Sequence, residues 1–378
     1  MFRFEPRGEA SPFWTYASPV LAIILTVLGT GIIFMMLGQA PLPAVYTFLV
    51  APLVDGGGLA ALAIKAAPLM MMGAGLALCY RTSVWNIGAE GQFTVGAITA
   101  GGMALAMPDA PSWLLYPAIL LAGVLGGAIV AAISAYLRTE LNVSEILSSL
   151  MLTYIAQLVL IYLVTGPWRD PMGFGFPQTA MFTSSAATPN LVEGTGVHLG
   201  CLVAPMIALV MWVILSKSVL GFQLRVVGEA PRAARFGGFS ERNLVWVAML
   251  VSGGIAGLAG TFEVTGPIGQ LTTEISPGYG FTAIIVAFLG RLHPIGAIFA
   301  GLLLALSYLG GNAAQIDLGM PNAVTSIFQG ILLFCLLACD ILILYRVKIV
   351  RPQITTAEAE PAPPKSIPVG NQSNGTGQ

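Results

Sequence analysis

Long stretches without a charged side chain follow one another along most of the sequence. They lie at 10–54, 110–137, 146–168, 194–216, 243–262, 292–316 and 318–339. A helix needs about 20 mostly apolar residues to cross the hydrocarbon of a bilayer, and only helices and closed barrels satisfy their backbone there. Barrel strands would be short and would alternate between apolar and polar residues. These stretches are long and unbroken, so they predict membrane-spanning helices.

The pattern divides into about ten spans. We place them at 18–37, 59–80, 90–107, 113–136, 144–165, 197–215, 243–264, 279–290, 294–312 and 322–343. Basic residues gather in cytoplasmic loops and thereby indicate orientation. With the N-terminus inside, fourteen of the sixteen Lys and Arg residues are cytoplasmic, Arg169 is outside and Lys65 lies within a span. One span more or fewer would destroy this division. The sequence therefore predicts an all-α polytopic membrane protein with both termini in the cytoplasm.

Composition supports this fold class, and the placement of the spans divides the chain into three parts. Apolar residues make up 56% of the chain and charged residues 9%, against roughly 25% charged in a soluble domain. We expect a cytoplasmic N-terminal segment at 1–17, a transmembrane domain at 18–343 and a cytoplasmic tail at 344–378. The first apolar stretch is too long for a cleavable signal, so it should remain as the first helix. The tail is rich in Pro, Ala, Ser, Asn and Gly, and we expect it to be largely disordered.

The sequence lacks the signatures of several chemistries. It has two histidines and no Gly-Lys pair, so the phosphate loop of an ATPase is missing. GxSxG and HExxH are missing too. Cys335 and Cys339 share a helix face but lack the two further ligands that zinc requires. We therefore expect no enzyme activity, cofactor, metal or nucleic-acid partner, which leaves transport or a scaffold role.

The densest polar segment is 81–92, between the second and third spans. Its candidate functional residues are Asn86, Gly88, Glu90, Gly91 and Gln92. A carboxylate at a helix start is favoured by the helix dipole and can cap the amides there, and glycines permit a break in the helix. Broken helices at membrane depth are tolerated where they line a cavity. The alternative is an ordinary cytoplasmic turn followed by a capped helix.

A second polar segment, the predicted cytoplasmic loop 217–242, contains five basic residues. Pro231 is a typical helix start and Gly237 a typical helix end, which predicts a short helix from about Pro231 to Phe236. Such a helix beneath the membrane could dock into the groove of a partner. The alternative is a loop whose positive charge only determines topology.

The two halves of the chain correspond in their pattern of spans. Spans two to five and seven to ten form four-helix blocks that enter the membrane in opposite directions. The third span follows the polar break, and the eighth is short, with Pro277 and Gly278 at its outer end. Interrupted spans at matching positions of inverted repeats point to a transport pathway.

At these segments the chain resembles the membrane subunits of ABC importers of the ribose and branched-chain amino acid type, in the branch that handles nucleosides and simple sugars. The segments that carry the resemblance are 86–92, 144–152, 166–171, 227–234, 252–260 and 277–281. Relatives often have Asn-Glu before the fifth span and Met-Leu-Asn-Tyr within it. Here Ser144 and Thr153 take the place of the two asparagines.

The resemblance implies two membrane subunits, often different chains, driven by a cytoplasmic ATPase and supplied by an external solute-binding protein, in the inner membrane of a bacterial cell. It implies a pathway at the broken helices, with Asn86, Gly88, Glu90, Gly91, Gln92, Glu145, Pro277 and Gly278. It also implies that an ATPase-coupling segment comprises Gly228, Glu229, Pro231, Arg232, Ala233, Ala234, Arg235 and Gly237.

The main alternative is an ion-coupled secondary transporter of a small polar solute. Such a carrier usually keeps acidic residues near the membrane midplane. Here Glu145, Glu263 and Asp340 fall near predicted span ends, which disfavours it. We expect Lys65 to extend toward the outer membrane surface instead of binding solute. A scaffold without transport would not account for the paired broken spans.

Overall fold

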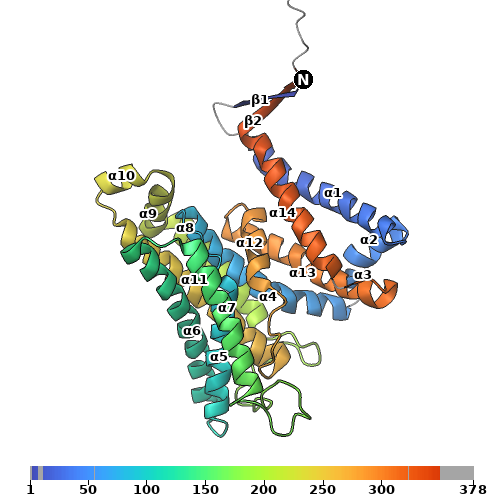
Figure 1. Ribbon diagram of the computed structural model, residues 1–378, viewed down its shortest axis with the longest axis vertical. Helices are drawn as coiled ribbons and strands as arrows, with labels where there is room; N and C mark the ends of the chain where they lie inside the picture. Colours follow the sequence, from blue (N-terminus) through green and yellow to red (C-terminus); the bar gives the residue numbers. More distant parts are fainter. Residues whose placement is uncertain (1, 7–11, 55, 322, 350–378) are drawn as a thin grey trace, which may run out of the picture.

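The computed structural model describes residues 2–6, 12–54, 56–321 and 323–349, most of which are helical (Figure 1). The helices are α1 (Pro12–Met36), α2 (Pro41–Leu49), α3 (Ala51–Val54), α4 (Gly56–Arg81), α5 (Ala89–Ala106), α6 (Ser112–Leu141), α7 (Glu145–Thr165), α8 (Leu199–Lys217), α9 (Val219–Glu229), α10 (Pro231–Phe236), α11 (Glu241–Glu263), α12 (Tyr279–Leu289), α13 (Pro294–Leu318) and α14 (Ala323–Leu344). A π-helical turn, η1 (Val264–Ile268), extends α11. Each of the ten predicted spans overlaps one of these helices.

Eight helices among the described residues are long and apolar enough to cross a membrane. They are α1, α4, α6, α7, α8, α11, α13 and α14. The multi-pass membrane fold is thereby confirmed, while the count of ten spans stays a prediction. The two remaining helices are α5, whose sequence is rich in small and polar residues, and α12, which has only 11 residues. At 1.5 Å per residue, α12 spans about half of the hydrocarbon layer.

Several short elements were not predicted from the sequence. One is α9, which lies in the predicted loop 217–242, and others lie near the ends of the chain. Helices α2 and α3 occupy the predicted loop after the first span. Strand β1 (Phe2–Pro6) pairs antiparallel with β2 (Tyr345–Ile349), so the two described ends of the chain lie side by side (Figure 1). The first residues of the predicted disordered tail are therefore a strand, because pairing with a distant segment supplies the hydrogen bonds. Residues 350–378 lie outside the described part.

Helices α4 and α11 lie at the centre of the protein. In their most apolar windows 78% and 67% of the residues are buried, against 28% in each of α1, α7, α8 and α14. Small residues permit this central packing. An added Cβ at Gly257 on α11 would overlap the carbonyl oxygen of Gly123 on α6, so only glycine lets the two backbones approach this closely. The outer helices leave much of their apolar surface exposed in the single chain.

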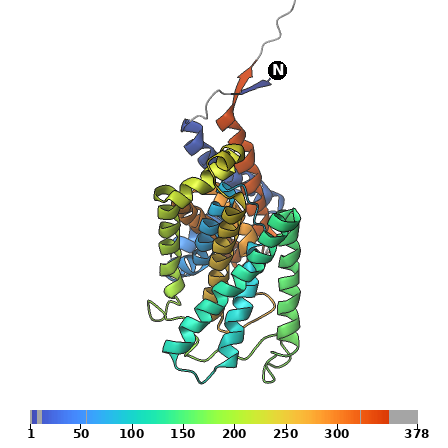
Figure 2. The same cartoon turned by 90° about the vertical axis from the view of Figure 1, so that its left-hand side faces the viewer.

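The helix contacts are matched between the two predicted four-helix blocks. Helix α11 packs mainly against α6 and α5, whereas α4 packs most against α13 and also against α8, α11 and α12. The first helix of each block therefore contacts the second and third helices of the other. Inverted repeats would produce this exchange, and the inverted arrangement stays a prediction. Figure 2 shows the long helices of the α5–α8 region running broadly along the long axis of the molecule.

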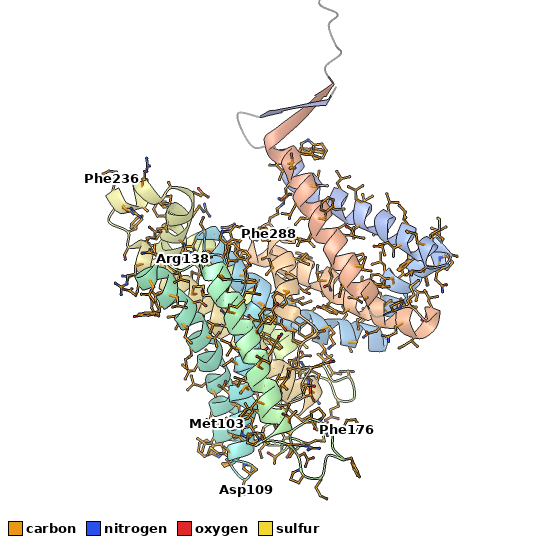
Figure 3. All side chains as sticks on the ribbon, in the orientation of Figure 1. Met103, Asp109, Arg138, Phe176, Phe236 and Phe288 are labelled. Atoms are coloured by element: carbon orange, nitrogen blue, oxygen red, sulfur yellow. The ribbon has the colours of Figure 1, made fainter. Side chains whose placement is uncertain are left out.

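The molecule has two distinct ends. We call one the α10 end, because it carries α9, α10 and, further out, the β1–β2 pair (Figure 1). The other, which we call the loop end, carries the α5–α6 turn with Asp109 and the long α7–α8 connection with Phe176 (Figure 3).

Candidate functional site

The starts of α5 and α12 meet inside the protein. Glu90, in the first turn of α5, is 2% exposed, and its Oε2 accepts a hydrogen bond of 2.6 Å from the backbone N–H of Gly280 in α12. An added Cβ at Gly280 would overlap the backbone of Glu90, so the two helix starts are in backbone contact. We call this contact the α5–α12 junction. Glu90 therefore caps another helix, whereas the sequence suggested that it caps its own.

A buried amide network precedes the junction. The Nδ2 of Asn86 donates to Gln92 Oε1 at 3.0 Å and to Ser252 Oγ of α11 at 3.2 Å. Its Oδ1 accepts from Gln92 Nε2 at 3.0 Å and from the N–H of Gly88 at 3.1 Å. Asn86 and Gln92 are both fully buried. The segment is thus part of the protein interior, which the alternative of an ordinary cytoplasmic turn did not anticipate.

The two glycines of this segment provide contacts for α7. An added Cβ would lie 2.8 Å from Ser149 Cβ at Gly88 and 2.6 Å from Thr153 Cα at Gly91. Both distances are shorter than van der Waals contact. Thr153, where relatives often carry Asn, is therefore a packing neighbour of the start of α5, and it is fully buried.

The other predicted pathway residues divide between two places. Gly278 directly precedes α12 in a left-handed conformation (φ +95°), which glycine adopts without strain, and Pro277 lies before it. Glu145 lies instead at the α10 end, where it forms an ion pair with Arg138 and accepts from the N–H of Trp85 at 3.2 Å. The structure thus gathers 86–92 and 277–278 around the junction, while Glu145 holds the preceding α4–α5 turn.

Sequence reasoning missed a buried charged group beside the junction. The Lys65 Nζ of α4 lies 2.6 Å from the hydroxyl of Tyr279 and 3.5 Å from Glu263 Oε1. Glu263 is 3% exposed. Lys65, which we expected to extend toward the outer membrane surface, directs its ammonium group to Tyr279 and Glu263, while a third of its side chain stays exposed. Glu263 lies at the end of α11, near a span end as predicted, and is buried. The sequence contained a signal for this pair, namely one isolated Lys and one isolated Glu within apolar segments. Because an unpaired charge in such a segment is costly, the two could have been expected to pair.

Neutral polar groups continue from this charged pair along α12. Thr282 Oγ1 lies 2.7 Å from the hydroxyl of Tyr308 and donates to Gln329 Oε1 at 3.1 Å. The rings of Tyr279 and Tyr308 meet edge to face with their centroids 5.5 Å apart. We call Lys65, Glu263, Tyr279, Thr282, Tyr308 and Gln329 the α12 polar cluster. Its members come from five helices, and its charges neutralise one another.

The predicted coupling segment forms two helices at the α10 end. Helix α10 occupies Pro231–Phe236 as the sequence predicted, and Gly237 is its C-cap. Arg232 and Ala233 are exposed, and Phe236 is 96% exposed at the tip (Figure 3). Ala234, which the resemblance placed in the coupling segment, is 1% exposed, so it packs within its own chain and is not available to a partner. Phe236 was not among the predicted residues.

The α9–α10 segment is connected to the α4–α5 turn. The Oγ of Ser83 in this turn donates to the carbonyl oxygen of Gly228 in α9 at 3.0 Å. An added Cβ at Gly228 would overlap the carbonyl oxygen of Arg81, so glycine is needed for this close approach. Glu229 ends α9 and is exposed. A continuous path of contacts thus runs from α9 through the α4–α5 turn to the junction.

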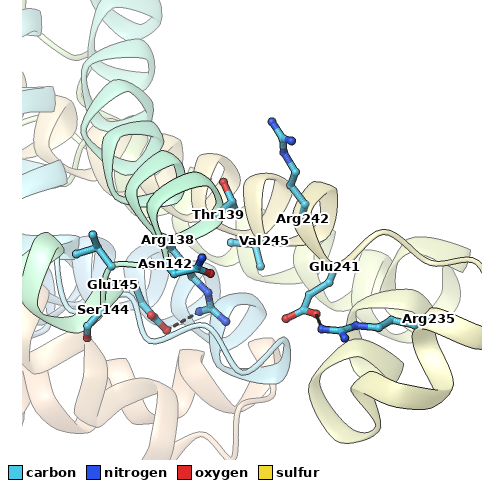
Figure 4. Close-up of a pocket in the computed structure, with 10 residues that line it drawn as sticks. Arg138, Thr139, Asn142, Ser144, Glu145, Arg235, Glu241, Arg242 and Val245 are labelled. Carbon is cyan, nitrogen blue, oxygen red and sulfur yellow. Dashed lines mark hydrogen bonds and ion pairs between the residues drawn. The ribbon is translucent and has the colours of Figure 1, made fainter.

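A polar cavity of about 560 Å³ lies beside α10 (Figure 4). It separates the α6–α7 turn, which contains the Arg138–Glu145 pair, from the start of α11. On the far wall Arg235 pairs with Glu241 at 3.1 Å, so Arg235 is already engaged within the chain. Arg232 therefore remains as the free cation of α10 among the described residues.

Comparison with known proteins identifies the class. Residues 58–337 match the family described as "Branched-chain amino acid transport system / permease component". The chain is 34% identical to the glucose ABC transporter permease protein TsgB13 of Haloferax volcanii, over 92% of this chain and 93% of that protein. It is also similar to two guanosine ABC transporter permease proteins of Bacillus subtilis. These are NupP (31% identical, 70% of this chain and 77% of that one) and NupQ (30%, 68% and 84%).

The family match covers most of the chain and all the segments on which the resemblance rested. The family match also decides between an ABC importer and an ion-coupled secondary transporter. The positions of the carboxylates do not decide this, because Glu90 and Glu263 are both buried beside α12. The chain thus belongs to the family of ABC transporter permease components, and is a transport subunit and not an enzyme.

Proposed function

We propose that this permease forms the translocation pathway for a nucleoside or a related simple sugar. The main support is the agreement among its relatives, which are named as permeases for glucose and for guanosine. Both solutes are neutral and rich in hydroxyl groups. Their recognition requires hydrogen bonds and aromatic faces more than net charge.

The chemistry of the junction supports this solute class. The α12 polar cluster offers hydroxyl, amide and tyrosine groups, and its one Lys and one Glu already neutralise each other. Lys65 is 33% exposed, so the cluster reaches the protein surface. We propose that the pathway runs along the α5–α12 junction, with Glu90 holding the two helix starts in register and not contacting the solute.

We further propose that the α9–α10 segment binds a cytoplasmic ABC ATPase. The exposed Arg232, Ala233 and Phe236 would enter the interface, and Gly228 would transmit movement to the α4–α5 turn. With this assignment, the α10 end and both chain termini would lie on the cytoplasmic side of a cell (inner) membrane. The loop end would then face an external solute-binding protein.

The second pore-forming subunit would be a different permease chain. NupP and NupQ come from one organism and carry the same description, which is what a pair of unlike permeases would produce. The apolar faces of α7 and α14, which are mostly exposed in the single chain, are candidates for this contact and for lipid.

Reconstitution in vesicles tests the proposal. We expect labelled guanosine or glucose to accumulate only when this chain is combined with its ATPase, partner permease and binding protein, and only with ATP. A non-hydrolysable ATP analogue is the matched control. ATP-driven uptake of an amino acid, with no uptake of nucleoside or sugar, would overturn the solute assignment. Accumulation by this chain alone under a proton or sodium gradient would overturn the energy source.

A further inference from the structure

Two adjacent cavities at the α10 end share a pair of arginines. The first has a volume of about 550 Å³ and lies between the end of α4, the helix α9 and the α12–α13 turn. The second, of about 630 Å³, lies between α1 and the first turns of α13. Arg81 and Arg291 line both of them, so the two cavities meet at these side chains.

The second cavity is an apolar groove. On α13 its wall consists of Gly296, Phe299, Ala300 and Leu303, which repeat at the spacing of a single helix face. Ile23 contributes the opposite wall from α1. The groove extends about 10 Å along α13, from the helix start toward its middle. Because α1 and α13 are both candidate membrane spans, we expect the groove to lie within the hydrocarbon layer.

The first cavity carries positive charge that the described residues neutralise only in part. Arg291 is bound to Asp340 at 2.9 Å and to Ser18. In contrast, neither Arg81 nor Arg225 forms an ion pair with any described residue. Of the three arginines that line this cavity, Arg291 is neutralised by Asp340, which leaves Arg81 and Arg225 against the single carboxylate of Glu229. It is therefore suited to an anion.

We propose that the two cavities together bind one anionic phospholipid. Its phosphate lies between Arg81 and Arg225, and one acyl chain lies in the groove between α1 and α13. The order of the groups supports this occupant, since cations stand at the ends of spans and an apolar groove leads from them toward the membrane interior. Anionic lipid headgroups are attracted to basic residues at this depth. Neither a soluble phosphate compound nor an acidic protein segment carries an acyl chain, so either one would leave the groove empty.

Native mass spectrometry of the detergent-purified full-length chain tests the site. The probes are dioleoylphosphatidylglycerol, the zwitterionic dioleoylphosphatidylcholine, and glycerol 3-phosphate as a headgroup without acyl chains. We expect one phosphatidylglycerol to be retained per chain, with weaker retention of phosphatidylcholine and none of glycerol 3-phosphate. Equal retention of the two lipids, or retention of glycerol 3-phosphate alone, would overturn the proposal.

Two sets of variants separate the headgroup site from the groove. Each basic residue near a membrane surface is worth a factor of about five in lipid affinity, so Arg225→Gln should weaken phosphatidylglycerol binding about fivefold, and Arg81→Gln with Arg225→Gln about twenty-five-fold. Ile23→Trp should also weaken binding, because the indole fills the groove.

The matched controls are Arg232→Gln on α10 and Leu28→Trp on the exposed face of α1, which is 61% exposed. Both should bind lipid as the wild type does. Gel filtration confirms that each variant is folded before it is compared. Unchanged lipid binding in the double arginine variant would overturn the proposal, as would loss of ATPase association in that variant without loss of lipid.

Discussion

At the scale of single residues, Glu90 illustrates how a buried charge is stabilised in an apolar protein. Its carboxylate accepts the N–H of Gly280 at the start of α12 and lies in the first turn of α5. The N-terminal ends of both helices carry partial positive charge, so the carboxylate is attracted to two dipoles at once. The residue therefore stabilises the relative position of two short helices, and its position is well suited to controlling their movement.

Replacing Glu90 by Gln should impair transport while preserving assembly. The amide oxygen can still accept from Gly280, but the charge that the two helix dipoles favour is lost. We expect a stability loss of about 1–2 kcal/mol and a severalfold fall in uptake. Uptake in vesicles and the yield of assembled complex give the two readouts. Glu193→Gln in the exposed α7–α8 connection is the control, and normal uptake by the Glu90 variant would reduce Glu90 to a packing role.

Gly280→Ala should be more damaging, because its methyl group would overlap the backbone of Glu90. Overpacking of this kind costs about 1–3 kcal/mol and should separate the starts of α5 and α12. Gly330→Ala in α14 is the matched control, since nothing lies within 4 Å of an added Cβ there. That control should be neutral or slightly stabilising, because alanine favours the helix. Equal thermal stability of the two variants in detergent would contradict the close contact.

At the scale of elements, the α9–α10 segment presents a small and well-defined surface. Ala234 anchors α10 to its own chain, and Arg235 is bound by Glu241. Arg232 and Phe236 remain exposed, and these are the side chains that we propose contact the ATPase. Exposed aromatic and arginine side chains are the types enriched at the centres of protein interfaces.

Arg232→Glu combined with Phe236→Ala should weaken ATPase association by at least about 2 kcal/mol, since one charge is reversed and one anchor is removed. Arg235 is left unchanged in this variant, because a reversed charge there would place a second carboxylate beside Glu241. Co-purification with the ATPase gives the readout.

Arg235→Gln is the control for this experiment. It breaks only an exposed ion pair, worth about 1 kcal/mol or less, and should leave the association intact. If the double variant associates with the ATPase as the wild type does, the segment is not an ATPase-binding site, and its positive charge only determines topology.

At the scale of the whole molecule, the two ends differ in what they offer. The α10 end carries the α9–α10 segment, the arginine-lined cavities and the paired strands β1 and β2, whereas the loop end carries the long α7–α8 connection. A transporter needs such asymmetry, because an energy source and a solute must act from opposite sides of the membrane.

Labelling of introduced cysteines tests this orientation. Gly194→Cys in the α7–α8 connection should react with a membrane-impermeant maleimide in intact cells, because the proposed orientation has the loop end outside. Arg232→Cys on α10 should react only after the membrane is opened. The protein without an introduced cysteine gives the background labelling of the four native cysteines, of which Cys79 and Cys339 are buried. The reverse pattern would invert the topology derived from the distribution of Lys and Arg.

The sequence by itself determined that the protein spans a membrane, where the helices of its ten predicted spans lie, and that α10 runs from Pro231 to Phe236. These features depend on local apolar length, proline and glycine, which a single segment contains. Only the tertiary structure decided that Glu90 caps α12, that Lys65 pairs with Glu263, that Ala234 is buried and that β1 pairs with β2. Each of these is a contact between segments far apart in the chain. The Lys65–Glu263 pair, for example, joins residues separated by 198 positions, and the side chain that neutralises a buried charge cannot be recognised until the backbone has brought the two together.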